Sequence, residues 1–242
     1  MMKRASVIGV VVALIVGGAT CIGFGAMSLR VYGGYSMLDP TDYNDYIQSQ
    51  ADKRETLYGT PGEATVDKLS SSIPYGVDVR FGANPGLMFC LGFTRFSGEA
   101  GYSWESTGGT YSIQRADTIS AMGGLGSVLY TVGSGDFSLY FGGGAGYYSV
   151  NLEKTLPVED APGDALEYKA KKNQLGYHGE AGFQYFVTDN IAVGLGFAYR
   201  WLTISDMELT EYDISSRVGE TWWGPDLDLG GISILVGVNI YT

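Results

Sequence analysis

The most constraining feature of this chain is an alternation of apolar with small or polar residues that recurs in eight separate segments. In one of them, for instance, Phe89, Leu91 and Phe93 are separated by single small residues. Such a period of two places successive side chains on opposite faces of a β-strand. The segments cover residues 28–38, 73–82, 87–94, 118–132, 137–147, 175–187, 191–201 and 232–240. The pattern predicts an all-β fold of eight antiparallel strands.

The links between these segments alternate in length. Short turns follow the second, fourth and sixth segments, at Asn84-Pro85-Gly86, Gly133-Ser134-Gly135 and Thr188-Asp189-Asn190, whereas long polar links follow the others. This arrangement is typical of a transmembrane up-and-down β-barrel, with short periplasmic turns and long extracellular loops. Within the fourth segment the alternation is blurred near Gly123-Gly124, where we expect a β-bulge that shifts the register.

Charged residues are scarce where the strands are expected. They make up 17% of the chain, against about 25% in a typical soluble domain. None occurs within residues 118–135, 137–152 or 229–242. A charge facing lipid at mid-depth costs about 2–4 kcal/mol, so this absence favours a membrane barrel over the alternative, a soluble lipocalin-like barrel. The net charge of -11 argues against nucleic acid as a partner.

The N-terminus has the pattern of an export signal. Lys3 and Arg4 precede an apolar stretch at 7–16, and small residues follow it. This order predicts a signal peptide over residues 1–26, cleaved near Gly25 or Ala26, and a barrel domain over residues 27–242. Two alternatives stay open: an uncleaved transmembrane helix, and a lipid anchor on Cys21.

With these segments and turns, the chain resembles the small outer-membrane β-barrel superfamily of the OmpA, OmpX and OmpW type, from about Ser28 to Thr242. The resemblance implies a bacterial cell outer membrane location. We expect a monomer whose partners are outer-membrane lipid and the outer-membrane assembly machinery. Such barrels usually end in Phe, whereas this chain ends Ile240-Tyr241-Thr242, with Tyr241 on the opposite face from the Ile/Val row.

The interior of an eight-stranded barrel is just wide enough to be filled by side chains. Strand parity predicts an inward polar network made of Arg30, Asp78, Arg80, His178, Glu180, Gln184 and Arg200. This network is either a packed set of ion pairs or a gate that opens by exchanging partners. On the outer face, the expected membrane-interface aromatics are Tyr35, Tyr75, Tyr147, Tyr199 and Trp201.

The long links are where a specific function is expected. Within the first link, residues 42–50 predict a short helix capped by Thr41 or Asp42, which either folds over the barrel mouth or belongs to a mobile loop. The third link, at 153–172, mixes acidic and basic residues. The last link, at 206–226, contains Trp222-Trp223, which is either an interfacial anchor or a ligand contact.

No catalytic, metal or cofactor motif stands out in the sequence. Its two cysteines, Cys21 and Cys90, form no C-x-x-C pair. The single histidine, His178, lies in a His-x-Glu arrangement on a predicted inward face, which is typical of packing. We therefore predict no enzyme, no cofactor and no metal site.

We expect a structural, adhesion or surface-interaction role that is carried by the extracellular loops. The alternative is a narrow, porin-like channel or receptor for a small, possibly hydrophobic, molecule, which an apolar trough in the barrel would favour. A lipid-modifying enzyme ranks third, and it would be favoured by a serine within hydrogen-bonding distance of His178 at the membrane boundary.

Overall fold

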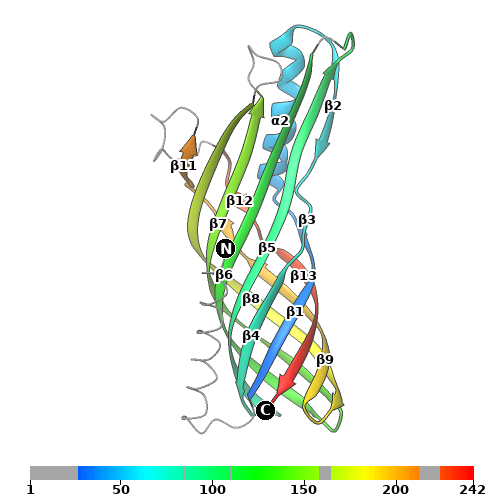
Figure 1. The fold of residues 1–242 in the computed structure, drawn as a ribbon, viewed down its shortest axis with the longest axis vertical. Helices are drawn as coiled ribbons and strands as arrows, with labels where there is room; N and C mark the ends of the chain where they lie inside the picture. Colours follow the sequence, from blue (N-terminus) through cyan, green and yellow to red (C-terminus); the bar gives the residue numbers. More distant parts are fainter. Residues whose placement is uncertain (1–26, 84, 110, 158–164, 213–223) are drawn as a thin grey trace, which may run out of the picture.

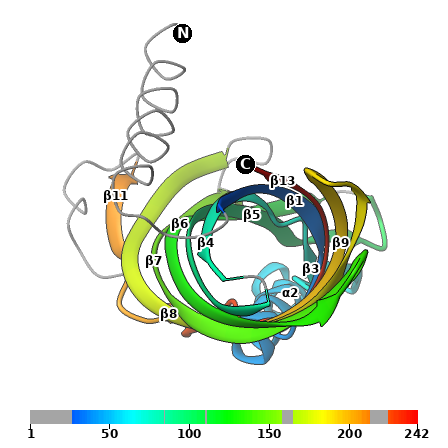
Figure 2. The same ribbon diagram turned by 90° about the horizontal axis from the view of Figure 1, so that it is seen from below.

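The computed structural model describes residues 27–83, 85–109, 111–157, 165–212 and 224–242. Within them, eight antiparallel strands form a closed ring, because β8 pairs with β9, β9 with β13, and β13 with β1 (Figure 2). In ring order the strands are β1 (Met27–Leu38), β4 (Tyr75–Gly82), β5 (Gly86–Ser106), β6 (Ser112–Ser134), β7 (Phe137–Pro157), β8 (Ala165–Thr188), β9 (Ile191–Trp201) and β13 (Gly231–Tyr241). The predicted eight-stranded barrel is confirmed.

The hairpins β4–β5, β6–β7 and β8–β9 lie at the end of the barrel where the C-terminus lies (Figure 1). Their connections are short, as the sequence predicted. Between β6 and β7, Gly135 has a φ of 66°, a left-handed conformation that glycine adopts without steric cost. The short turns therefore mark one rim of the barrel.

The strands of the ring differ greatly in length. β5, β6, β7 and β8 have 21, 23, 21 and 24 residues, whereas β1, β4, β9 and β13 have 12, 8, 11 and 11. Half of the wall therefore continues past the other half at the end opposite the short turns (Figure 1). The prediction of a loop at 153–172 is wrong, because β7 and β8 occupy most of that range. The long link expected between the third and fourth segments, residues 95–117, is likewise mostly strand, because β5 and β6 occupy most of it.

The predicted bulge at Gly123-Gly124 is also wrong. The register of β6 is unbroken there, with Gly123 opposite Thr94 on one side and Tyr148 on the other. Gly123 faces inward, and a Cβ at this position would lie 2.6 Å from the Tyr148 ring. The glycines blurred the alternation because they have no side chain to indicate a face. The ring's register does shift beside the β8–β9 turn, between Phe186 and Thr188.

The helix predicted in the first link is confirmed, and it is longer than expected: α2 covers Thr41–Tyr58. The predicted cap is wrong, since Pro40 occupies the N-cap position and no side chain caps the helix. The helix ends at Gly59, whose left-handed conformation is common at that position. No helix among the described residues is long and apolar enough to span a bilayer.

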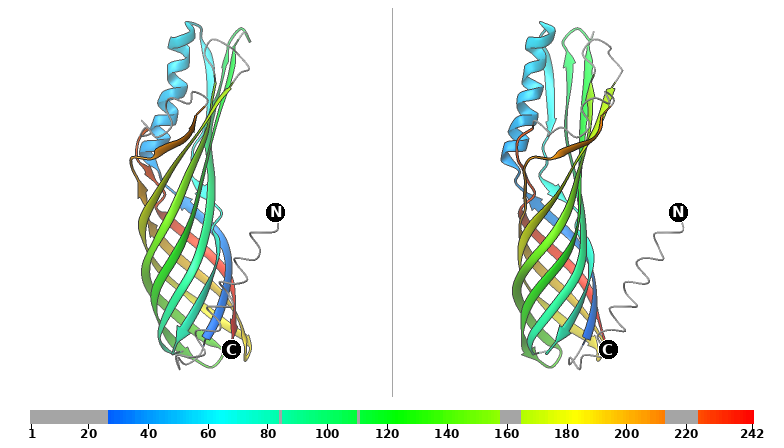
Figure 3. Two further views of the ribbon diagram at one scale, coloured as in Figure 1. Left: turned by 60° about the vertical axis from the view of Figure 1, so that its left-hand side comes forward. Right: turned by 90° about the vertical axis from the view of Figure 1, so that its left-hand side faces the viewer.

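α2 packs on the inner face of the extended half of the wall (Figure 3). β2 (Gly62–Asp67) adds an edge strand to β5, and β11 (Glu208–Tyr212) adds one to β8. Two-residue strands, β3 (Ser71–Ser72), β10 (Thr203–Ile204) and β12 (Leu227–Asp228), complete the fold. We call α2, β2 and the wall residues 95–106, 112–121, 148–157 and 165–172 the platform.

The platform has a hydrophobic core of its own. Tyr43, Ile47 and Ala51 recur along one face of α2 and are fully or almost fully buried. From the wall, Tyr102, Trp104 and other inward residues pack against them. The end of the barrel opposite the short turns is therefore covered by packed structure.

Candidate functional site

The outer surface of the ring is apolar over a defined height. On β6, the outward residues from Met122 to Val132 are apolar or glycine. This run of about ten residues corresponds to a height of about 26 Å along the barrel axis, at a rise of about 3.4 Å per residue and a strand tilt of about 40°. This matches the apolar band of about 25 Å in outer-membrane barrels. On β5 the band ends between Phe93 and Arg95, which are both exposed on the same face.

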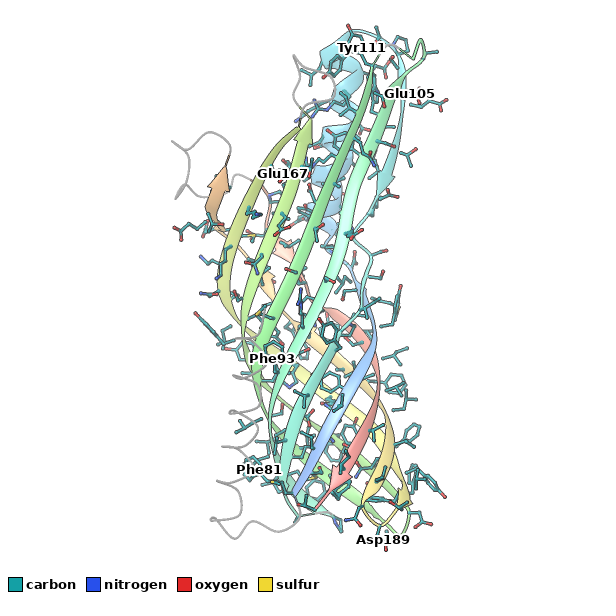
Figure 4. All side chains as sticks on the ribbon, viewed as in Figure 1. Phe81, Phe93, Glu105, Tyr111, Glu167 and Asp189 are labelled. Carbon is teal, nitrogen blue, oxygen red and sulfur yellow. The ribbon has the colours of Figure 1, made fainter. Side chains whose placement is uncertain are left out.

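Aromatic side chains lie along both edges of this band. Tyr130 and Phe137 lie near the short turns, and Tyr199 and Trp201 contact each other near the opposite edge, with ring centroids 4.5 Å apart. The predicted interface aromatics all project outward, with exposed fractions of 52% for Tyr35, 49% for Tyr75, 62% for Tyr147, 42% for Tyr199 and 55% for Trp201. Figure 4 shows Phe81 and Phe93 on the barrel, with Glu105 and Glu167 on the platform and Asp189 at the opposite rim.

A compact cluster of charges fills the middle of the lumen. Arg30 donates from Nε to Asp78 Oδ2 at 2.7 Å and from its guanidinium to Glu180. Arg80 donates from Nε to Asp78 Oδ1 at 2.9 Å, and its Nη2 lies 3.5 Å from Glu180 Oε1. Each carboxylate therefore faces both of these guanidinium groups, and the four buried groups balance in charge.

Tyrosine rings pack around this cluster. The guanidinium of Arg80 lies 4.9 Å from the Tyr140 ring centroid, and that of Arg30 lies 4.6 Å from the Tyr32 ring centroid. Gly182 makes room for Tyr140, because a Cβ there would lie 2.6 Å from the tyrosine hydroxyl oxygen. The lumen at this level is filled by side chains.

Gln184 is separate from the charge cluster. It is buried nearer the short turns, where its amide donates to Ser138 Oγ at 2.7 Å and accepts from the Tyr241 hydroxyl at 2.9 Å. Tyr241 thus faces inward, opposite the Ile/Val row of β13.

His178 and Arg200 lie opposite each other on β8 and β9, closer to the platform. His178 Nε2 and Ser127 Oγ are 2.7 Å apart. Arg200 donates from Nε to the Leu229 carbonyl at 3.0 Å and stacks 3.7 Å from the Phe96 ring centroid. Sequence reasoning missed Ser127 as a partner, although its inward parity on β6 is readable from the alternation.

Among the described residues, no third catalytic group joins the Ser127–His178 pair. In a hydrolase triad, a carboxylate accepts from the other imidazole nitrogen and orients the ring. Here His178 Nδ1 has no hydrogen-bond partner among the described residues. The pair borders a cavity of about 60 Å³ inside the barrel and does not face the lipid.

A second polar cluster holds α2 against the wall of the platform. Arg115 donates to both oxygens of Asp117, at 3.0 and 2.7 Å, and the Tyr43 hydroxyl of α2 donates to the same carboxylate. Lys154 Nζ lies 3.7 Å from Asp117 Oδ2 and 4.9 Å from the Tyr46 ring centroid. These contacts connect α2, β6 and β7 through one buried carboxylate.

Burial controls the acid–base behaviour of this platform cluster. It lowers the pKa of Lys154 to about 7, because the loss of hydration outweighs the attraction of Asp117. Burial also opposes the charge of Arg115, but its hydrogen bonds to Asp117 and the attraction of that carboxylate and of Tyr46 and Tyr43 together outweigh that effect and raise its pKa. This cluster was not predicted from the sequence, because its residues fall in segments expected to be polar links, although Ile113, Arg115 and Asp117 alternate in the strand pattern.

The lipid-facing wall carries an apolar groove of about 280 Å³. Phe81, Phe89, Leu91 and Val128 flank it, and Gly126 lies in its floor. A Cβ on Gly126 would meet a single atom within 4 Å, from the Leu91 side chain at 4.0 Å, so the space above this glycine is open.

Two predictions fall on residues outside the described ranges: the signal peptide over residues 1–26, with Cys21, and the anchor at Trp222-Trp223. They remain predictions.

The sequence pattern of a family described as outer membrane protein beta-barrel domain matches residues 30–221. No curated protein matches the sequence. Among solved structures, OprG from Pseudomonas aeruginosa aligns with a TM-score of 0.48 at 12% identity, over 91% of this chain and 98% of that chain. Neisserial surface protein A aligns with a TM-score of 0.44 at 12% identity, over 89% and 98%. The outer membrane protease OmpT from Escherichia coli aligns with a TM-score of 0.45 at 14% identity, over 90% and 95%.

Proposed function

Because the chain belongs to the family of outer membrane proteins with a β-barrel domain, we propose that it acts at the cell surface and that its platform binds a partner outside the cell. The role is adhesive or another surface interaction. The barrel anchors the platform in the outer membrane, and we place the platform on the extracellular side because the short turns of such barrels are periplasmic.

The folded platform is the observation that carries this proposal. A barrel with a purely anchoring role needs strands that match the lipid band, whereas β5 to β8 continue well beyond it. The extension is packed against α2 through a buried core. Binding surfaces that are rigid before contact lose less conformational entropy on association, so an ordered extension suits recognition.

The outer face of the platform offers an extended polar surface. Four strands present cross-strand rows of side chains there, including Glu99, Thr118, Glu153 and Lys169 in adjacent register. A parallel row contains Ser97, Ser120, Asn151 and Lys171. Such rows provide donors, acceptors and charges of both signs on a continuous sheet.

A cell-binding assay tests the proposal. The full-length chain is displayed on a non-adherent bacterium, and the bound cells are counted on an epithelial monolayer. We expect display to raise binding several-fold and the double variant E99K/E153K to lower it, because both exposed carboxylates lie on the polar face. The matched control is D189K, the same charge reversal in an exposed turn at the opposite rim.

Equal binding with and without the displayed chain would contradict the surface role. The purified protein is then tested in a planar lipid bilayer, where steady ion conductance would move a narrow channel to first place.

The apolar groove favours a second candidate function, the binding of a hydrophobic molecule or acyl chain at the barrel wall. Its test is crosslinking of a photoactivatable fatty acid to the protein in micelles. We expect G126L, which fills the groove, to reduce labelling. G124L is the control, because a Cβ on Gly124 meets nothing within 4 Å and this residue does not line the groove. Equal labelling of both variants would exclude the groove as a binding site.

A further inference from the structure

Positive charge exceeds negative charge in the upper lumen. Arg30 and Arg80 are balanced by Asp78 and Glu180, with which they share four contacts. Arg200 is 7% exposed, and no carboxylate among the described residues lies within ion-pair distance of it. The lumen therefore contains one guanidinium that forms no direct ion pair in the described part of the protein, and Asp228 attracts it only from beyond ion-pair distance.

Unused hydrogen-bond donors face the same space. Arg200 Nη2 is buried and has no hydrogen-bond acceptor among the described residues, and the buried Arg80 Nη2 forms no hydrogen bond beyond its 3.5 Å ion-pair contact with Glu180 Oε1. When the Ser127 hydroxyl donates to His178 Nε2, a neutral imidazole carries its proton on Nδ1, and this atom also lacks a partner in the described part of the chain. Buried donors of this kind are normally satisfied, so a further acceptor is expected between them.

Arg200, His178 and Arg80 line a cavity of about 60 Å³, together with Asp78 and Glu180, whose charges Arg30 and Arg80 balance. About 10–15 Å³ is enough for one water-sized group, so the cavity holds a small ion or a few waters and nothing larger. A buried, unbalanced guanidinium is strongly unfavourable in a low-dielectric interior. A monovalent anion would offset the positive charge and accept hydrogen bonds from the unmatched donors, whereas water would only accept the hydrogen bonds.

We propose that the upper lumen of the barrel binds a small monovalent inorganic anion, of the halide class, between Arg200, His178 and Arg80. This site is independent of the platform surface and of any partner that the platform binds. It assigns the Ser127–His178 hydrogen bond a positioning role, because Ser127 fixes the tautomer that points Nδ1–H at the anion.

The first experiment locates the ion in the intact protein. The full chain is crystallised from detergent in the presence of bromide, and anomalous diffraction is recorded at the bromine edge. We expect a peak inside the cavity within hydrogen-bonding distance of Arg200 Nη2. A cavity with ordered water and no anomalous peak would overturn the proposal.

The second experiment measures the effect of the ion on stability. Thermal unfolding is followed by the gel mobility shift in bromide and in gluconate, which is too large for the cavity, at equal ionic strength. Because a ligand that binds only the folded state stabilises it, we expect bromide to raise the unfolding midpoint by about 5 °C. An identical midpoint in both salts would contradict the site.

Two variants separate this site from general salt effects. R200M removes the unbalanced charge and should abolish the difference between bromide and gluconate. R95M removes one cation from an exposed position on the outer face and should keep the full difference. A bromide effect that survives in R200M would overturn the proposal, and the diffraction experiment decides the case if R200M does not fold.

Discussion

At the residue scale, Lys154 is the most unusual side chain of the platform. It is fully buried between α2 and the wall, beside Asp117, Arg115, Tyr43 and Tyr46. Its folded-state pKa of about 7 lies below the ordinary value of 10.5. Between these two pH values the folded platform binds fewer protons than the unfolded chain, so its stability must rise with pH.

This gives a testable pH dependence. Below about pH 7 Lys154 is protonated in both states and the cost of burying its charge is fully present; from pH 7.5 to 9.5 stability rises by up to about 1.4 kcal/mol per pH unit. The measurement is urea unfolding followed by circular dichroism at 222 nm, which reports on α2. We expect K154M to lose this slope and K171M, at an exposed position on the same sheet, to keep it. An unchanged slope in K154M would assign the pH dependence to other groups.

At the element scale, α2 depends on tertiary packing. Ile47 is fully buried against the wall, whereas Leu57 on the same helix is 57% exposed. We expect I47A to destabilise the docked helix by about 2–5 kcal/mol through the cavity that it leaves, and L57A to change stability by less than about 0.5 kcal/mol. Hydrogen exchange of the α2 amides measures both effects. Faster exchange in L57A than in I47A would contradict the packing described here.

The same scale explains what the sequence predicted and what it did not. The ring was predictable because lipid on one side and packed side chains on the other produce a clear alternation, as in residues 232–240. The upper halves of β5 to β8 were not recognised, because their outer face is polar and Arg115, Asp117 and Lys154 interrupt the apolar inner face. The amino-acid composition of these strand segments therefore resembles that of loops. The partners of Arg30, Arg80 and Ser127 depend on ring closure, which the parity of a single strand does not define.

At the scale of the whole molecule, barrel and platform share four continuous strands. Among the described residues, no break in these strands separates the platform from the lipid-facing wall. The two zones differ in what surrounds them: the barrel wall faces lipid with apolar side chains, and the platform faces water with polar rows. The boundary between Phe93 and Arg95 on β5 sets the depth at which the protein sits in the membrane.

This boundary predicts how the cost of an added charge varies with height along β6. Val128 lies on the lipid-facing side at about half the height of the apolar band, whereas Ser120 lies on the same face of the same strand above the band. We expect V128R to destabilise the folded protein by about 2–4 kcal/mol, and S120R by about 0–1 kcal/mol, because only the first places a guanidinium in hydrocarbon. The measurement is the urea-dependent folding equilibrium into lipid vesicles, with the mobility shift as the check that each variant closes its barrel. Equal costs for the two variants would place the lipid band at a different height from the one given by the exposed apolar residues.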